Sequence, residues 1–316
     1  MKPFLSPTRV VALILLLPLM LSAQDSDDWV STEFDSLIQV SRQHTASAEF
    51  DAAFEASRQA KALALECCGE TSVAYASFCF NEGRVHDFMS SDEEAIVWYT
   101  RSLNLREELL GKTHIDYSKS LNNLASVFVE LGQLDKAEPL YLESLEIREQ
   151  TVGVESSDYA KVLYNLSGLY HEIGDFERAE LRGIEAKEIR ERVLGKDHEH
   201  YASSLINLAN ISYETNNFER ALALYLEAKA ILEKQEYLPF YSYVATLDNL
   251  GAIHEQLGKF VEAETFYDRA AELRLQVFGE DTENYALTLN HLASVYKYTD
   301  RLAEAEQALQ QALAIL

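Results

Sequence analysis

Residues 117–153 read YSKSLNNLASVFVELGQLDKAEPLYLESLEIREQTVG, and residues 159–195 read YAKVLYNLSGLYHEIGDFERAELRGIEAKEIRERVLG. The second stretch repeats the first after 42 residues, with large residues, small residues and glycines in matching places. A tyrosine opens each such copy, at Tyr75, Tyr117, Tyr159, Tyr201, Tyr243 and Tyr285. A fixed period of this length over most of a sequence means that one supersecondary unit is stacked on copies of itself.

Each copy contains two amphipathic helical patterns. In the first, Leu121, Leu124 and Ala125 lie on one helical face, and equivalent residues recur in the other copies. In the second, an alanine recurs without exception, at Ala53, Ala95, Ala137, Ala179, Ala221, Ala263 and Ala305. Glycines stand between and after the two patterns, where they can supply a left-handed turn. We therefore predict an all-α fold made of antiparallel helix pairs.

Taken together, the recurring positions of large residues, small residues and glycines resemble the tetratricopeptide repeat. The 42-residue period, with Leu-Asn-Asn-Leu-Ala at 121–125 and Ile-Arg-Glu-Arg-Val-Leu-Gly at 189–195, is similar to the kinesin-light-chain-like variant of that repeat. The resemblance covers about residues 30–316 and implies a right-handed superhelical solenoid that binds other proteins. Seven units are expected within residues 33–316, the first degenerate and the last truncated, after a short segment at 24–32. They start near residues 33, 75, 117, 159, 201, 243 and 285.

The first 23 residues differ from the rest of the chain. Lys2 and Arg9 come before an apolar run from Val10 to Leu21, and small residues follow before Gln24. This pattern predicts a secretory signal peptide, residues 1–23, cut after Ala23. The alternative is an uncleaved anchor, although the run is shorter than the roughly 20 residues that span a bilayer. We expect an exported protein, periplasmic or secreted, of a bacterial envelope.

The chain is strongly acidic, with a formal net charge of −25 that becomes −27 when Lys2 and Arg9 leave with the signal peptide. A surface of this charge repels nucleic acid and anionic lipid, so neither is expected as a partner. The surplus carboxylates fall on the second helical patterns and the loops, for example at residues 92–94. Such placement indicates a solvated outer face.

Three cysteines occur, at Cys67, Cys68 and Cys79. An odd count with an adjacent pair lacks the spacing of a zinc site. A disulfide from Cys79 to Cys67 or to Cys68 is one possibility in an exported chain. The other possibility is that Cys79 packs as a small apolar residue. The repeat favours this possibility, because Cys79 occupies a repeat position that is predicted to be buried.

Two short segments suggest chemistry at first sight. Gly111-Lys112-Thr113 lacks the earlier glycine of a phosphate-binding loop, because Arg106 occupies that position. His198 and His200 lie in a loop between repeats and lack the spacing that would place two metal ligands on one helical face. We therefore expect no enzyme, metal, cofactor or small-molecule substrate.

The resemblance implies that the first helices line a concave groove. Beside the apolar face, each of these helices carries a polar stripe of four residues at spacings of 4, 3 and 4. The second residue of this stripe is an asparagine in five successive units: Asn81, Asn123, Asn165, Asn207 and Asn249. Asparagine is a poor helix former, and its carboxamide can pair with a peptide backbone. The alternative is that each asparagine braces the neighbouring repeat, and both roles can hold together.

The predicted peptide-binding residues are Asn81, Arg84, Lys119, Asn123, Ser126, Lys161, Tyr164, Asn165, Asn207, Asn210, Tyr213, Asn249 and His291. The leading interpretation is an exported, non-enzymatic scaffold that binds an extended peptide or protein segment. The alternative is a sensor arm of a longer chain with a C-terminal CHAT-type protease or signalling domain, which the resemblance to long bacterial repeat proteins implies.

Overall fold

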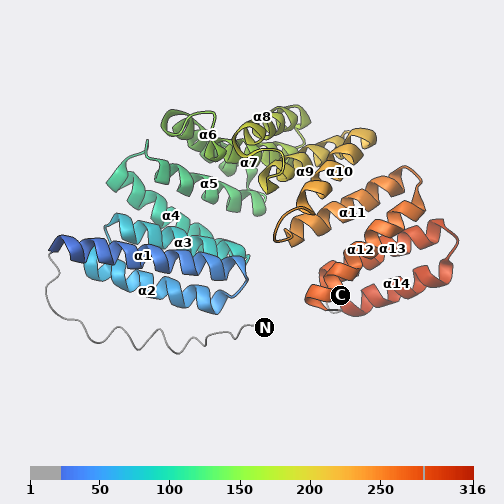
Figure 1. Ribbon diagram of the computed structural model, residues 1–316, viewed down its shortest axis with the longest axis horizontal. Helices are drawn as coiled ribbons and strands as arrows, with labels where there is room; N and C mark the ends of the chain where they lie inside the picture. The colour runs from blue at the N-terminus through green and yellow to red at the C-terminus, as the bar shows by residue number, and fades with distance from the viewer. Residues whose placement is uncertain (1–22, 280–281) are drawn as a thin grey trace. The chain divides into compact units, whose positions relative to one another are not determined.

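The computed structural model describes residues 23–279 and 282–316. The predicted signal peptide lies outside these residues, apart from Ala23. Within the described ranges the chain forms fourteen α-helices and no strand, which confirms the all-α prediction. Short turns join them into antiparallel pairs (Figure 1).

The first helices of the pairs are α1 (Ala23–Ala46), α3 (Val73–Phe88), α5 (Ile115–Glu130), α7 (Ser157–Ile173), α9 (Glu199–Glu214), α11 (Phe240–Gln256) and α13 (Glu283–Tyr298). The second helices are α2 (Phe50–Cys68), α4 (Asp92–Leu110), α6 (Leu134–Thr151), α8 (Phe176–Leu194), α10 (Phe218–Leu232), α12 (Phe260–Phe278) and α14 (Leu302–Ile315). The chain divides into two compact units, an N-terminal unit up to Leu109 and a C-terminal unit from Leu110 to Leu316.

The small residues of the repeat let the two helices of a pair approach closely. The alanines Ala137, Ala179, Ala221 and Ala263 are fully buried. At Gly251 a Cβ atom would stand 2.6 Å from the ring of Tyr267, so this position accepts no side chain without a shift of that ring. Large residues on one helix therefore fill the space left by small residues on the other.

The C-terminal unit has two rows of helices. The first helices of successive pairs contact one another (α5 with α7, α7 with α9, α9 with α11, α11 with α13), and each second helix contacts the first helix of the next pair. No comparable contact joins successive second helices in the described part of this unit. Because the first helices form the closer row, they lie on the concave side (Figure 1).

Two details differ from expectation. Helix α1 already begins at Ala23, so residues 24–32, expected as a separate segment, are helical. The disulfide joins Cys67 to Cys68, and Cys79 is free and buried. The pairing of Cys79 with either neighbour is therefore wrong, whereas its burial in the helix interface is confirmed.

Candidate functional site

The asparagines of the C-terminal unit donate hydrogen bonds to the preceding repeat. Asn165 Nδ2 donates to Asn122 Oδ1 at 3.0 Å, and Asn207 Nδ2 donates to Ser167 Oγ at 2.7 Å. Asn249 Nδ2 lies 3.4 Å from Asn210 Oδ1. In each case the acceptor stands about one repeat earlier in the sequence, on the neighbouring first helix. These side chains therefore brace the stack.

The oxygen atoms of the same carboxamides have a different environment. In the described structure the Oδ1 atoms of Asn165, Asn207 and Asn249 accept no hydrogen bond. Asn165 and Asn249 are half-buried, and Asn207 is 8% exposed. Each side chain thus uses its N–H group within the protein and leaves a carbonyl oxygen that can accept a hydrogen bond from a ligand.

Asn81, in the N-terminal unit, behaves differently. It is 0% exposed, and its Nδ2 donates to Ser41 Oγ at 2.8 Å. Its Oδ1 is buried without a partner. A ligand cannot reach this side chain while the helices are packed, so the prediction of a peptide-binding role for Asn81 is wrong.

Three of the predicted residues meet at one cavity of about 350 Å³ in the C-terminal unit, which we call the tyrosine pocket. It is lined by His171 of α7, by Asn210, Tyr213 and Glu214 of α9, by Tyr225 of α10, and by Asn249 and Ala252 of α11. The Tyr225 hydroxyl donates to Asn210 Oδ1 in a short hydrogen bond. The Tyr213 ring packs edge-on against Phe218, with their centroids 5.5 Å apart.

The pocket has a negative electrostatic character. Burial and the carboxylates of Glu214 and Glu255 raise the pKa of Tyr213. Burial, the neighbouring Tyr213 and Glu214 raise the pKa of Tyr225. Both phenols therefore stay protonated at neutral pH, and the pocket offers neutral hydroxyl groups beside a carboxylate.

The other predicted residues are not brought to this pocket. Lys119 pairs with Asp116 on its own helix at 2.8 Å, and the Ser126 and Tyr141 hydroxyls are 2.9 Å apart. Tyr164 lies under Arg190, 4.5 Å from the guanidinium carbon to the ring centroid, and therefore serves the packing. The His291 ring stacks on Tyr267. Arg84 lies in the N-terminal unit, and Asn123 and Lys161 lie on α5 and α7.

The sequence reasoning missed His171, Glu214 and Tyr225. A signal for His171 was present, because it precedes Tyr213 by one repeat of 42 residues and so occupies the same position of the first helix. The Tyr225 ring is buried between the helices of its pair, and its hydroxyl donates to Asn210 on the first helix.

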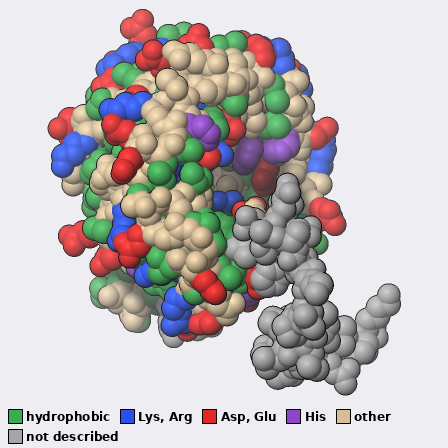
Figure 2. Space-filling view, turned by 90° about the vertical axis from the view of Figure 1, so that its left-hand side faces the viewer, with side chains coloured by type: hydrophobic (Ala, Val, Ile, Leu, Met, Phe, Trp, Pro, Cys, Tyr) green, Lys and Arg blue, Asp and Glu red, His purple; other side chains and the backbone are tan. Residues whose placement is uncertain are grey.

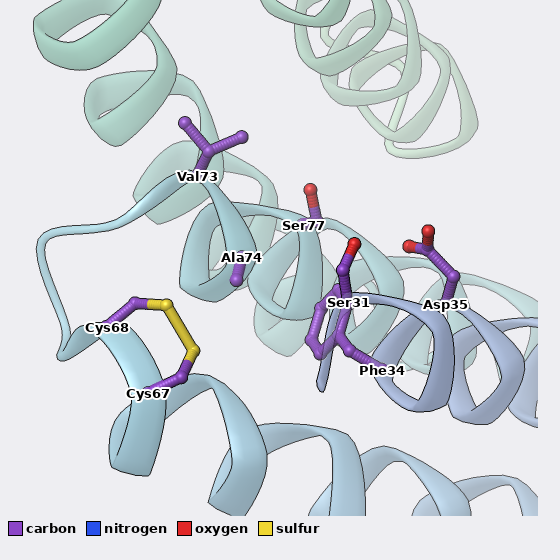
Figure 3. A pocket seen from close by; sticks show the side chains of 8 residues that line it. All are labelled: Ser31, Phe34, Asp35, Cys67, Cys68, Val73, Ala74 and Ser77. Carbon is purple, nitrogen blue, oxygen red and sulfur yellow. A yellow bond between two sulfur atoms is a disulfide. The ribbon is translucent and has the colours of Figure 1, made fainter. Parts of the chain in front are cut away.

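A second cavity, of about 440 Å³, lies in the N-terminal unit among α1, α2 and α3. Figure 3 shows the Cys67–Cys68 disulfide on one side of it and Phe34 and Asp35 on the other. This cavity contains none of the predicted peptide-binding residues.

Charged side chains of both signs are interspersed on the face shown in Figure 2. Within residues 23–279 and 282–316, no group of three or more His, Cys, Asp or Glu side chains is placed to hold a metal ion. A search of the same residues finds no helix with the length and apolarity needed to cross a membrane.

Comparison with solved structures finds similar folds at low sequence identity. BtubC (BKLC) from P. vanneervenii is 24% identical, with a TM-score of 0.58 over 79% of this chain and 92% of that one. A putative kinesin light chain with nearly identical TPR-like repeats, from P. anserina, is 20% identical, with a TM-score of 0.55 over 64% and 96%. NprR in complex with its cognate peptide NprX is 16% identical, with a TM-score of 0.62 over 88% and 76%.

Comparison of the sequence with protein families is more specific. No curated protein matches the chain. The tetratricopeptide repeat model matches residues 83–150, 116–186, 158–234 and 243–316, which together make up most of the sequence. The chain therefore belongs to the tetratricopeptide repeat family, and proteins with kinesin-light-chain-like repeats are among the structures that it resembles.

Proposed function

We propose that this protein is an exported, non-enzymatic scaffold that binds an extended peptide or protein segment along the first helices of its C-terminal unit. The observation that carries the proposal is the row of carboxamide oxygens on Asn165, Asn207 and Asn249, which accept no hydrogen bond within the described residues. They recur once per repeat and point to backbone N–H groups of an extended ligand as their partners.

The expected affinity is moderate. Each hydrogen bond to a peptide N–H contributes about 0.5–1.5 kcal/mol. A few such bonds, less the cost of ordering the peptide, give a dissociation constant on the order of micromolar. The fold of NprR is similar, and NprR was solved in complex with its cognate peptide NprX, which supports a peptide as the ligand. Tighter binding requires side-chain pockets beside the asparagines.

A peptide-display experiment tests this proposal. A library of randomised 12-residue peptides is selected on the full-length protein, and the enriched peptides are titrated against the double variant Asn165→Ala, Asn249→Ala. We expect binding to weaken about tenfold, which corresponds to about 1.4 kcal/mol. The matched control is Asn104→Ala, an exposed asparagine on α4 of the N-terminal unit, which should leave the affinity unchanged.

Because the asparagines also brace the stack, the double variant could lose binding by unfolding. Circular dichroism therefore measures the folded fraction of each variant. Affinities are compared at a temperature at which the double variant is fully folded. Enriched peptides that bind the folded double variant as tightly as the wild type would show that the asparagines act only as braces.

The proposed location outside the cytoplasm is supported by Lys2, Arg9 and the apolar run from Val10 to Leu21. Expression of the full chain in a bacterial host, followed by fractionation and N-terminal sequencing, tests it. We expect an exported form that begins at Gln24. A chain that keeps residues 1–23 and stays in the cytoplasm would contradict export.

A further inference from the structure

We infer that the tyrosine pocket receives the guanidinium group of an arginine side chain from the bound peptide. This inference rests on the proposed function and adds the chemistry that the site selects. Two tyrosines, a carboxylate and carboxamide groups line a cavity of about 350 Å³ formed by α7, α9, α10 and α11.

The pocket offers hydrogen-bond acceptors that lack donors. His171 Nε2 is buried and has no hydrogen-bond partner. Because this atom is buried, a ligand in the cavity pairs with other acceptors. The Asn249 oxygen and the Glu214 carboxylate provide these acceptors at the same cavity. A ligand group that only donates satisfies all of them.

The charges around the pocket favour a cation. The charged groups that act on the two phenols are the carboxylates of Glu214 and Glu255. No lysine or arginine is among the described residues that line the pocket, and the Glu172 carboxylate lies 3.7 Å from His171 Nδ1. The half-buried ring of Tyr213 can hold a cation over its face, whereas the Tyr225 ring is 2% exposed and contributes only its hydroxyl. An anionic side chain would be repelled by Glu214.

The repeat itself explains why this pocket lies beside His171. In two other units a second-helix tyrosine hydroxyl reaches the first-helix residue equivalent to His171: Tyr99 bonds to Asp87 at 3.0 Å, and Tyr267 bonds to Glu255 at 3.3 Å. In the unit of His171 the equivalent position is Gly183. A Cβ atom there would lie 2.9 Å from Leu208 and from Ser167 Oγ. His171 therefore lacks the second-helix hydroxyl that contacts its equivalents, Asp87 and Glu255.

The acceptor geometry selects arginine over lysine. Guanidinium is planar, carries five N–H donors in a fixed fork and stacks on aromatic rings. The pocket presents separate acceptors on α9 and α11 beside the half-buried Tyr213 ring, which one planar group can contact together. An ammonium group would reach fewer of these acceptors at once.

The test uses peptides selected on the full-length protein. Each residue of an enriched peptide is replaced by alanine, and each arginine is also replaced by citrulline, which is neutral and of nearly equal shape. We expect one arginine whose change to citrulline weakens binding ten- to hundredfold. In the Glu214→Gln variant this loss should shrink to less than threefold. In the control variant Glu219→Gln, an exposed glutamate of α10 outside the pocket, the loss should stay as in the wild type.

The possible failures are distinguishable. Peptides that need Asn165 and Asn249 but bind equally with citrulline, or that require lysine or an acidic residue instead, would overturn the inference and leave the proposed function intact. An arginine effect of equal size in wild type and Glu214→Gln would also overturn it, because the guanidinium would then bind elsewhere. A library that yields no peptide dependent on Asn165 and Asn249 would overturn the proposed function, and this inference with it.

Discussion

Glu82 is a carboxyl group buried in the N-terminal unit. Its Oε1 accepts a short hydrogen bond from Ser57 Oγ, and Asn81 Nδ2 lies 3.4 Å from the same hydroxyl. Burial raises the pKa of Glu82 above its usual value of 4.5, although the Ser57 hydrogen bond opposes that shift. The folded state therefore binds the proton more readily than the unfolded chain does. Glu82 therefore stabilises the fold below pH 4.5, and this contribution is lost as the pH rises through its raised folded-state pKa.

The variant Glu82→Gln tests this reading, because glutamine keeps an acceptor for Ser57 and carries no charge. We expect the variant to gain stability relative to the wild type at pH 7.5, by roughly 1 kcal/mol, and to lose that advantage near pH 4.5. Thermal unfolding followed by circular dichroism at both pH values measures the difference. The control is Glu66→Gln, an exposed glutamate of α2. A stability difference between wild type and Glu82→Gln that does not change with pH would contradict the assignment.

At the scale of the helices, the buried arginines Arg148 and Arg190 each join a second helix to the first helix of the next pair. Arg148 Nε donates to Ser118 Oγ at 2.8 Å, and its NH1 donates to the Asp158 carbonyl at 2.6 Å. One unit later Arg190 NH1 donates to the equivalent carbonyl, that of His200, at 2.9 Å. It also donates to Ser204 Oγ of α9 at 2.8 Å, whereas the Ser118 partner of Arg148 lies on α5 of its own pair. These arginines therefore connect neighbouring repeats, and we call them inter-repeat clamps.

Replacement of Arg190 tests the clamp. Burial lowers the pKa of Arg190 to about 10, so the side chain is still charged at neutral pH. The variant Arg190→Lys cannot make both hydrogen bonds to α9 or stack on Tyr164, and we expect a loss of about 1–3 kcal/mol in the free energy of unfolding. Arg192→Lys is the matched control on the same helix, because Arg192 makes an exposed pair with Glu155. Urea unfolding measures both variants, and equal midpoints would contradict the clamp.

The sequence predicts the elements better than the contacts of the polar residues. The 42-residue period and the recurring small residues locate the helix pairs, because burial dictates which positions of each repeat are apolar. Asn165 and Asn81 occupy equivalent positions, yet Asn165 is half-buried and Asn81 is fully buried. The pocket at His171 depends on Gly183, which stands where other units have a tyrosine on the second helix. It also depends on the Tyr225 hydroxyl, which contacts the neighbouring first helix. A repeat pattern describes only what the units share, so the effect of a residue that differs in one unit is seen only in the structure.

At the scale of the whole molecule, the solenoid is stabilised by contacts between neighbouring pairs. Leu166 is 0% exposed and packs in a cluster that includes residues of α5, α6, α7, α8 and α9. In the C-terminal unit each helix touches only helices of its own and adjoining pairs. Stability in such an array is the sum of terms for each repeat and each interface between neighbours. A local defect should therefore spread to adjoining pairs and fade beyond them.

Leu166→Ala tests this spread. Removing the buried side chain should cost about 2–5 kcal/mol, and hydrogen exchange followed by mass spectrometry should then show faster exchange in α5 to α9. Helices α12 to α14 should exchange nearly as in the wild type, because they do not contact this cluster. Leu181→Ala on α8 is the matched control, since that leucine is 60% exposed and its loss leaves no cavity. A uniform acceleration over all helices of the C-terminal unit would mean that the unit unfolds as one cooperative block and that its repeats are not energetically separable.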